Sequence, residues 1–421
     1  MRSTLALVLS GGGGERLSVL TAERAVSAVP FGGKYRIIDF VLSNCCHSGL
    51  QKVAVLTQFA PTSLHDHIGS GRTWDLDRRG GGVQLLQPYL TREHAGWYRG
   101  TADALAKNLD AITGSGAQRV LVLSGDQVYK MDYRALLETH EQSGAVATLA
   151  VTAVAPADSW RFGMVTVDRN GRVRDLEEKP QSSSARLASM GIYLFDTEVL
   201  VEALKRSPVN LVLDVVRPLI EAGERVVAHE FQGYWEDVGT LSTYYRANLD
   251  LLAPEPRLVL NDGRWPILTR DEERPPVKVL TGAELDGSLV ANGCAVAGQV
   301  RNSVLFPGVT VEAGAVVVDS VILQDARIGA GARIDRAIID KYARIGEGAV
   351  IGDGEPLARE DLAWLEGLTL VGKDVVVPDG ARVERQAVLG VGADAGDFTD
   401  GRIAAGTRVL DRLVLVPVSL R

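Results

Sequence analysis

The N-terminal part of the chain alternates short apolar runs with amphipathic segments. The runs are continuous and rich in aliphatic and β-branched residues, which is typical of strands buried on both faces of a sheet. Strands are predicted over residues 5–9, 52–57, 119–124 and 145–154, and helices over 43–49, 63–68, 102–113 and 133–143. This alternation predicts an α/β domain with a mostly parallel sheet, helices on both faces, and ligands beyond the carboxyl ends of the strands.

A mixed pattern follows within the same domain. Asn170-Gly171 is a strong hairpin signal between the runs 164–168 and 172–176. Prolines from Ala253-Pro254-Glu255-Pro256 to Pro275-Pro276 then break the pattern. We therefore expect a first domain over residues 1–252 and a linker over 253–279. Within the first domain, further strands are predicted over 189–195 and 225–230, and helices over 198–205, 213–222 and 241–252.

Beyond the linker the sequence repeats every seventeen residues. Asn302-Ser303-Val304-Leu305 matches Asp319-Ser320-Val321-Ile322 and then Arg336-Ala337-Ile338-Ile339. Within a repeat the aliphatic residues are spaced six apart. This spacing is typical of a left-handed parallel β-helix built from hexapeptides, in which aliphatic side chains stack inside a triangular prism. We expect it over residues 280–421, with a helical interruption at 356–365.

Composition narrows the functional class. The net charge of −8 argues against general binding to nucleic acid, although a local basic pocket for phosphates is compatible with it. The three cysteines, of which Cys45 and Cys46 are adjacent, suit reduced thiols better than a disulfide or a metal site. No apolar run reaches transmembrane length. We expect a cytoplasmic protein with no membrane partner.

The first candidate for chemistry is a glycine-rich turn directly after the first predicted strand. Gly11 to Gly14 are four consecutive glycines, and Arg16 follows them. The amides of such a turn can hold phosphates, and long cationic side chains commonly accompany it. The turn is neither a dinucleotide fingerprint, because Arg16 or Leu17 stands where a third glycine is needed, nor a Walker loop.

Other candidates lie further along the first predicted domain. Asp126 and Asp237 could hold Mg²⁺ together with substrate phosphates, whereas a turn or N-cap role is the alternative for Asp126. The run Trp97–Ala102 could frame a nucleobase, or it could be a core aromatic pair with Thr101 as an N-cap. Lys179, in Glu178-Lys179-Pro180, places a cation where the chain leaves the sheet, or simply marks an exposed strand end.

Taken together, these motifs resemble the bacterial ADP-glucose pyrophosphorylase (glucose-1-phosphate adenylyltransferase) family. The similarity covers nearly the whole chain, in order, and includes a Rossmann-like nucleotidyltransferase domain followed by a β-helix. The matching stretches are residues 31–40 (FGGKYRIIDF), 42–45 (LSNC), 97–103 (WYRGTAD), 125–126 (GD), 189–193 (SMGIY) and 235–240 (WEDVGT).

The resemblance implies a reaction in which ATP and glucose 1-phosphate give ADP-glucose and pyrophosphate, for glycogen or α-glucan synthesis, with Mg²⁺. It implies that Asp126 and Asp237 hold the metal and that Arg16, Asp126 and Lys179 act in catalysis. The implied nucleotide-binding residues are Gly11, Gly12, Gly14, Gln58, Trp97, Tyr98, Gly100 and Thr101, and the implied sugar-phosphate residues are Gly163, Glu178, Lys179 and Ser189.

Two departures from the family pattern fall on the phosphate side. Gly13 stands where the family has an arginine, and Val26 stands where it has a lysine. The family's Asp-Phe-Gly-Lys-Asp is also replaced, by residues 211–215 (LVLDV). One hypothesis is an active enzyme in which Arg16, Arg24 and Mg²⁺ neutralise the pyrophosphate. The alternative is a catalytically silent regulatory subunit that binds sugar phosphates or nucleotide as effectors beside a competent partner.

Two further classes remain as alternatives. An acyltransferase using the β-helix is disfavoured, because the last histidine of the chain, His229, precedes the repeats. A sister nucleotidyltransferase with another base is disfavoured by the stretches 31–40 and 97–103. The resemblance also implies a homo- or hetero-tetramer, with the β-helix as a contact surface.

Overall fold

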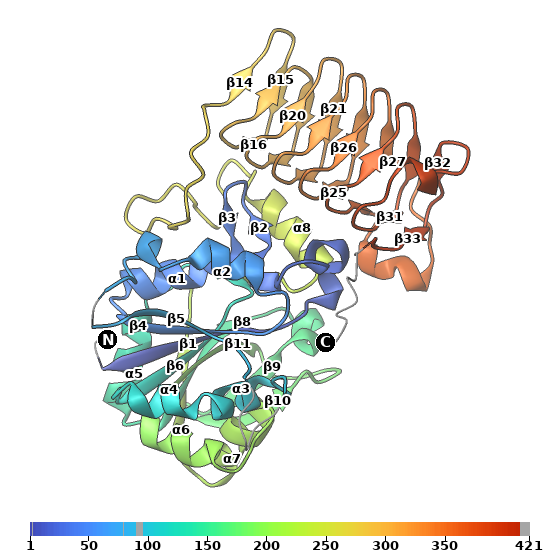
Figure 1. Cartoon of the computed structure of the whole chain (residues 1–421). Coiled ribbons are helices and arrows are strands. Elements are labelled where there is room, and N and C mark those ends of the chain that lie inside the picture. Colours follow the sequence, from blue (N-terminus) through green and yellow to red (C-terminus); the bar gives the residue numbers. More distant parts are fainter. Residues whose placement is uncertain (2, 79, 90–95, 413–421) are drawn as a thin grey trace, which may run out of the picture. The chain divides into compact units, whose positions relative to one another are not determined.

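A computed structural model describes residues 1, 3–78, 80–89 and 96–412 (Figure 1). Two compact units make up the chain. The first comprises Met1–Gly12, Ile38–Trp235 and Asp262–Arg270, and the second comprises Gly13–Ile37, Glu236–Asn261 and the chain from Asp271 onward. Because this division is not collinear with the sequence, the predicted boundaries at 252/253 and 279/280 stay predictions.

The first unit is built on a nine-stranded mixed sheet. Its central strands β6, β1, β4 and β5 are mutually parallel, and β11 runs antiparallel to β6, β8 and β9. The strand order is β10-β9-β11-β6-β1-β4-β5, with β8 pairing β11 and β12. The strands are β1 (Thr4–Ser10), β4 (Lys52–Thr57), β5 (Gly82–Leu86), β6 (Arg119–Ser124), β8 (Ala147–Ala153), β9 (Gly163–Val167), β10 (Val173–Glu178), β11 (Leu187–Asp196) and β12 (Val226–Glu230).

Helices lie on both faces of this sheet, as predicted (Figure 1). One core forms where alternate strand residues such as Leu5, Leu7 and Val120 pack with Leu105 and Leu200 from the helices. Burial on both faces explains why the central strands are continuously apolar. The helices are α1 (Ile37–His47), α2 (Thr62–Ile68), α3 (Thr101–Lys107), α4 (Leu109–Gly114), α5 (Tyr133–Ser143), α6 (Thr197–Leu204) and α7 (Arg217–Glu221).

Three helix predictions differ from the structure, the first because α1 begins at Ile37 and not at residue 43. The segment 102–113 is not one helix, because Asn108 divides α3 from α4 and its amide donates to Ala104 O (2.8 Å) and to Tyr98 Oη (2.9 Å). The segment 213–222 starts as a π-helix, Val212–Val216, before α7. An amide that bonds to nearby groups competes with continuation of the helix, which accounts for the break at Asn108.

The second unit contains the parallel β-helix that the repeats predicted. Val304 pairs with Val321 and Val321 with Ile338, in the seventeen-residue register. Its interior is a continuous column of buried aliphatic side chains, among them Val311, Ile328 and Ile345. Three parallel sheets form its sides: β14-β17-β20-β23-β26-β29, β15-β18-β21-β24-β27-β30-β32 and β16-β19-β22-β25-β28-β31-β33.

The strands of these three sheets are short. The first sheet has Lys278–Val279, Ala295–Val296, Thr310–Val311, Arg327–Ile328, Arg344–Ile345 and Val376–Val377. The second has Glu284–Asp286, Gln299–Arg301, Val316–Val318, Arg333–Asp335, Val350–Asp353, Arg382–Glu384 and Arg402–Ile403. The third has Leu289–Val290, Val304–Leu305, Val321–Ile322, Ala337–Ile339, Thr369–Val371, Val388–Leu389 and Arg408–Val409. The predicted interruption contains the 3₁₀ helix Glu360–Leu365, and residues 413–421 lie outside the described part.

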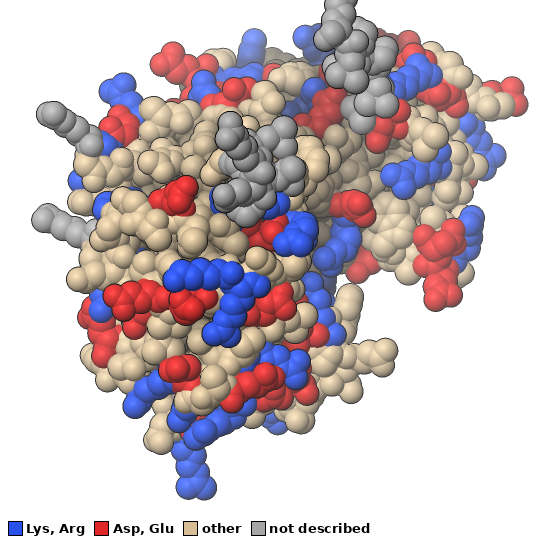
Figure 2. Space-filling view, turned by 60° about the horizontal axis from the view of Figure 1, so that its bottom comes forward, with Lys and Arg blue, Asp and Glu red and all other residues tan. Residues whose placement is uncertain are grey.

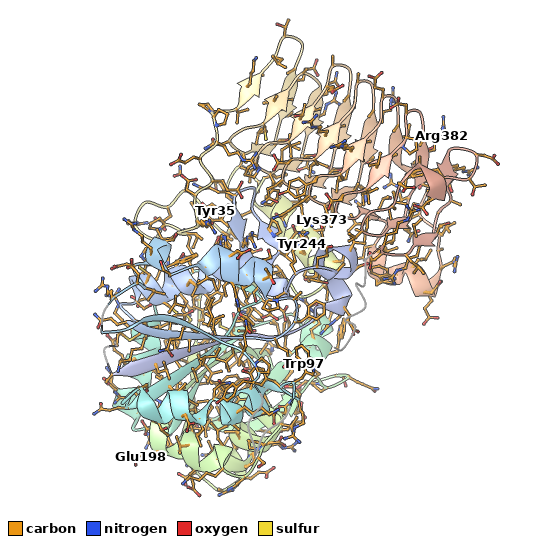
Figure 3. All side chains as sticks on the ribbon, in the orientation of Figure 1. Tyr35, Trp97, Glu198, Tyr244, Lys373 and Arg382 are labelled. Atoms are coloured by element: carbon orange, nitrogen blue, oxygen red, sulfur yellow. The ribbon has the colours of Figure 1, made fainter. Side chains whose placement is uncertain are left out.

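Non-repeat segments of the second unit are tied to the β-helix. Helix α8 (Leu241–Asp250) places Tyr245, whose hydroxyl donates to Asp319 O at 2.6 Å. The buried Arg24 guanidinium donates to both carboxylate oxygens of Asp340, at 2.9 and 2.8 Å, and Glu23 pairs with Lys373 at 2.7 Å. Tyr244 and Lys373 are labelled in Figure 3. Segment 13–37 thus belongs with the β-helix; it also carries β2 (Pro30–Phe31) and β3 (Tyr35–Arg36).

Figure 2 shows acidic and basic side chains interspersed on the face that it displays. None of the helices in the described part of the chain is both long enough and apolar enough to cross a membrane.

Candidate active site

A cavity of about 330 Å³ opens at the carboxyl ends of β1, β4 and β6 in the first unit. Parallel neighbours end at the same edge, so the residues that follow each strand meet there. Seven residues predicted from the sequence line it: Gly11, Gly12, Gln58, Tyr98, Gly100, Thr101 and Asp126. Leu9, Leu56, Arg99, Ala104 and Ser124 complete the lining.

Gly11 and Gly12 present bare backbone to this cavity. A Cβ on Gly11 would lie 3.3 Å from Gln58 Cβ, whereas one on Gly12 would meet nothing within 4 Å. A side chain at Gly11 would therefore press on Gln58. The exposed amides at these positions suit the backbone recognition of phosphate that the sequence predicted.

Gln58 holds the turn that carries the aromatic motif. Its Oε1 accepts from Tyr98 N at 2.5 Å, and its Nε2 donates to Tyr98 O at 3.3 Å. Burial raises the pKa of the Tyr98 hydroxyl, which accepts from Asn108. Because both ends of the Gln58 amide are used by the backbone of Tyr98, Gln58 lies beside the cavity mainly as a positioning residue.

Gly100 and Thr101 secure a segment distant in sequence. A Cβ on Gly100 would lie 2.4 Å from Val209 O, so no larger residue fits there without backbone movement. The Thr101 hydroxyl accepts from Leu211 N at 2.9 Å. The N-cap of α3 is Gly100, with no side-chain cap, so the interpretation of Thr101 as an N-cap is wrong.

Arg99 is a cavity residue that the sequence reasoning did not single out. Its backbone N and its guanidinium donate to Asp103 at 2.8–3.1 Å. The Asp103 side chain is 6% exposed, and the Arg99 side chain is 60% exposed. Burial of Asp103 opposes its ionisation, but hydrogen bonds from Arg99 and Lys107 outweigh it and keep the carboxyl pKa below its usual value. The sequence does contain a signal for this role, because Arg99 is a basic residue directly before Gly100 in the motif of residues 97–103.

Trp97 is exposed rather than in the core. Its side chain is 68% exposed, so the interpretation of residues 97 and 98 as a core aromatic pair is wrong for Trp97 (labelled in Figure 3). Its carbonyl accepts from Lys107 Nζ at 2.8 Å. Trp97 lines a second cavity, which also belongs to the first unit.

Asp126 supplies the acidic group of the cavity. It lies between β6 and β7 (Gln127–Tyr129), and Ser124 Oγ donates to its Oδ1. One carboxylate with substrate phosphates is a common Mg²⁺ arrangement. No group of three or more acidic, histidine or cysteine ligands occurs within the described residues. Asp237, at the end of β13 (Trp235–Asp237), is in the second unit, where its Oδ1 accepts from Gly239 N at 2.8 Å.

The second half of the glycine turn belongs to the second unit. Gly14 has φ 62°, and a Cβ there would lie 2.2 Å from Val26 Cγ2, so an aliphatic side chain packs directly on the turn. Thr21 Oγ1 donates to Gly14 O at 2.8 Å. Arg16 is exposed. Arg24 is committed to Asp340, which removes the support for Arg24 as a substitute phosphate cation.

The predicted sugar-side residues meet on three adjacent strands. Gly163 pairs with Glu178 across β9 and β10, and a Cβ on Gly163 would lie 3.2 Å from Glu178 Oε2 and 3.8 Å from Ser189 Cβ. The Ser189 hydroxyl hydrogen-bonds Tyr193 Oη at 3.0 Å, and burial raises the pKa of Tyr193 to about 12. Lys179 has φ 47°, and its Nζ lies 4.0 Å from Glu178 Oε1.

Family comparisons agree with this architecture. Residues 5–253 match a family model described as nucleotidyl transferase, and residues 275–371 match one described as GlmU-like, C-terminal hexapeptide. A glucose-1-phosphate adenylyltransferase from Thermomicrobium roseum is 49% identical, over 97% of this chain and 98% of the relative. The enzyme from Thermotoga maritima is 47% identical, over 98% of this chain and 100% of the relative. The chain belongs to the glucose-1-phosphate adenylyltransferase family.

Membership confirms the resemblance drawn from the motifs and the left-handed hexapeptide β-helix. It also makes the chain a nucleotidyltransferase by family. A further relative of the same name, from Acetivibrio thermocellus, is 40% identical over 97% of this chain. The comparisons give no support to the regulatory-subunit alternative. The roles of individual residues in this adenylyltransferase remain predictions.

Proposed function

We propose that the first cavity binds ATP with Mg²⁺ and that the chain transfers the adenylyl group to glucose 1-phosphate, giving ADP-glucose and pyrophosphate. The observation that carries this proposal is the meeting of Gly11, Gly12 and Asp126 with the Tyr98–Thr101 turn in one cavity. Exposed amides suit the phosphates, and Asp126 suits the metal, which would offset charge on the leaving pyrophosphate.

The chain's own residues take distinct roles in the proposal. The amides of Gly11 and Gly12 bind ATP phosphates, and Arg99 contributes a cation at the same cavity. Lys179 binds the phosphate of glucose 1-phosphate, while Glu178 and Ser189 orient the sugar. A phosphate oxygen of glucose 1-phosphate attacks the α-phosphorus in line, so binding and orientation supply most of the rate.

We propose that turnover is slow, because the cavity is poor in cations. Arg99 is the one basic side chain among the described residues that line it, and Asp103 already holds that guanidinium. Purified chain with ATP, glucose 1-phosphate and Mg²⁺ should form ADP-glucose slowly and in proportion to chain concentration. Formation of no ADP-glucose by the purified chain would contradict the proposed activity.

Lys179→Gln should weaken binding of glucose 1-phosphate by about tenfold, because a charge-assisted contact to phosphate is lost, and leave ATP binding unchanged. Lys179 is half-exposed, with only a 4.0 Å approach to Glu178, so the fold should tolerate the change. Isothermal titration of each substrate measures the effect. The matched control is Lys205→Gln, which removes an exposed lysine of α6's C-terminal end. Equal losses for both variants would remove Lys179 from the sugar-phosphate site.

A second binding function is supported by a basic cluster inside the second unit. Burial, together with the nearby charges of Arg36 and Arg24, lowers the pKa of Lys341 to about 7, against the opposing charges of Asp340 and Glu272. No hydrogen bond or ion pair of the Lys341 ammonium is present within the described residues. A half-buried amine among cations suits an anionic ligand, and we propose that effector sugar phosphates bind there.

Anion binding at this cluster should be linked to proton uptake. The pKa of Lys341 lies near 7 without ligand, so an anion that raises it makes the lysine take up a proton at pH 8. Affinity for inorganic phosphate should therefore fall as pH rises above about 7. Titration calorimetry at pH 8 in two buffers of different ionisation enthalpy measures the uptake. Lys341→Gln should abolish it and the exposed-residue control Lys278→Gln should keep it; uptake retained in Lys341→Gln would contradict the assignment.

Assembly and compartment complete the proposal. We propose that copies of the chain, or the chain and a homologous subunit, associate as a tetramer. The first coil of the β-helix supports this, because it exposes Val279, Leu280 and Leu285 beside edge strands. A cytoplasmic location is supported by free cysteines at positions 45, 46 and 294.

A further inference from the structure

The second cavity of the first unit, of about 320 Å³, has a largely aromatic and apolar lining. Tyr89 and Trp97 supply exposed rings, Pro61 and Pro88 supply apolar walls, and the cavity shares Gln58 with the first cavity. Such walls suit a planar ring, because bases stack on aromatic side chains. Since the Gln58 amide is bonded to Tyr98 at both ends, Gln87 supplies the lining amide that is left to read a base edge.

Gln87 follows β5 directly, and His65 from α2 holds its amide. Gln87 Nε2 lies 3.1 Å from His65 Nδ1 and 3.3 Å from His65 Nε2. His65 Nε2 also lies 2.9 Å from Thr57 Oγ1, and Thr57 Oγ1 donates to Leu86 O at 3.5 Å. These contacts join Thr57, at the end of β4, to His65 and to the end of β5 at Leu86 and Gln87.

One tautomer of His65 satisfies the contact with Thr57 and the shorter of the two contacts with Gln87. Because the Thr57 hydroxyl hydrogen is used toward Leu86 O, its oxygen accepts from His65 Nε2–H, which leaves His65 Nδ1 as an acceptor. The Gln87 NH₂ group then donates to His65 Nδ1, and Gln87 Oε1 is the end of the amide left for a ligand. Burial lowers the pKa of His65 against the opposing charge of Asp66, which favours this neutral ring.

We propose that His65 is a positioning residue for base selection: it turns the Gln87 amide so that its carbonyl oxygen receives a nucleobase amino group. This inference rests on the proposed binding of ATP. Adenine carries an exocyclic amino donor, and guanine carries a carbonyl acceptor at the corresponding ring carbon. An acceptor on the protein therefore favours ATP over GTP.

Variants at His65 test this through the ratio of the dissociation constants of GTP and ATP, each with Mg²⁺, measured by isothermal titration. His65→Leu removes the acceptor and should lower the ratio about tenfold, the equivalent of one hydrogen bond. His65→Glu offers a permanent acceptor and should retain the preference for ATP. His65→Lys offers only donors, so it should turn the amide and favour GTP. A purely structural role of His65 would affect both nucleotides equally.

His229→Leu is the matched control, because His229 also bonds a threonine hydroxyl, that of Thr139 at 2.8 Å, and lines neither cavity. It should leave the ratio unchanged. An unaltered ratio in His65→Leu, or an equal loss in His65→Glu, would overturn the positioning role while ATP binding stands. Absence of binding of either nucleotide to the unmodified chain would instead overturn the proposed function. Thermal unfolding of each variant confirms that the chain is folded.

Discussion

Introducing Gly13→Arg together with Val26→Lys should raise the rate of ADP-glucose formation by about 10²–10³-fold. The two changes restore cations at the positions where the family pattern has an arginine and a lysine. Removing one preorganised charge-stabilising donor typically lowers kcat by about 10²–10³-fold, so restoring the pair should recover at least that factor. The effect should fall on kcat, because charge on the pyrophosphate develops in the transition state.

Both changes lie in the second unit, one in the second half of the glycine turn and one in the segment that packs on it. Val26 is buried against Gly14, and the aliphatic stem of a lysine can cover that contact. We expect a small change in thermal stability beside a large change in rate.

A neutral pair of similar size separates charge from packing in this experiment. Gly13→Gln with Val26→Met adds comparable side chains without cations and should leave the rate within a few fold of the unmodified chain. Initial rates of pyrophosphate release at saturating substrates measure both variants. If the neutral pair accelerates the reaction as much as the charged pair, the rate is limited by the shape of the turn, and the cation argument fails.

The sequence predicted those parts of the fold that short-range patterns determine. The β-helix follows from a local repeat, since each coil needs the same aliphatic residues at the same spacing, and pairs such as Val321 with Ile338 have the predicted register. Strand β5 was not predicted, because its Gly82 and Gln84 dilute the apolar pattern and its stability comes from pairing with β4. The division of α3 from α4 depends on the Asn108 contact with Tyr98 Oη, ten residues earlier in the chain.

Site residues were predicted where a short sequence motif indicates their chemistry. Predictions failed where contacts with a segment distant in the sequence determine what a residue does. Glycines and an aspartate directly after apolar strands pointed to one edge of a parallel sheet, and they line one cavity there. Gly100 and Thr101 were assigned to nucleotide, yet the contacts that the structure shows are with Val209 and Leu211, about 110 residues away. Arg24 was a candidate phosphate cation until its partner, Asp340, was known.

Asp126→Asn should lower the rate of adenylyl transfer by about 10³-fold or more. Asp126 is the one acidic side chain among the described residues that line the cavity, so its loss removes the negative charge that would hold Mg²⁺ beside the phosphates. Asparagine keeps a carbonyl oxygen that can accept from Ser124 Oγ, so the local hydrogen bond survives. The expected result is therefore a loss of metal-dependent function in a folded protein.

The measurement is best made in the Gly13→Arg, Val26→Lys background, where the expected higher rate widens the measurable range. The Mg²⁺ concentration for half-maximal activity should rise together with the fall in kcat, since the carboxylate contributes to metal binding and not only to the shape of the cavity. Asp110→Asn, an exposed aspartate of α4 outside the cavity, should change neither quantity. An Asp126→Asn enzyme with an unchanged Mg²⁺ requirement would show that the metal is held elsewhere, because a metal site that loses the charge of one ligand binds its ion less tightly.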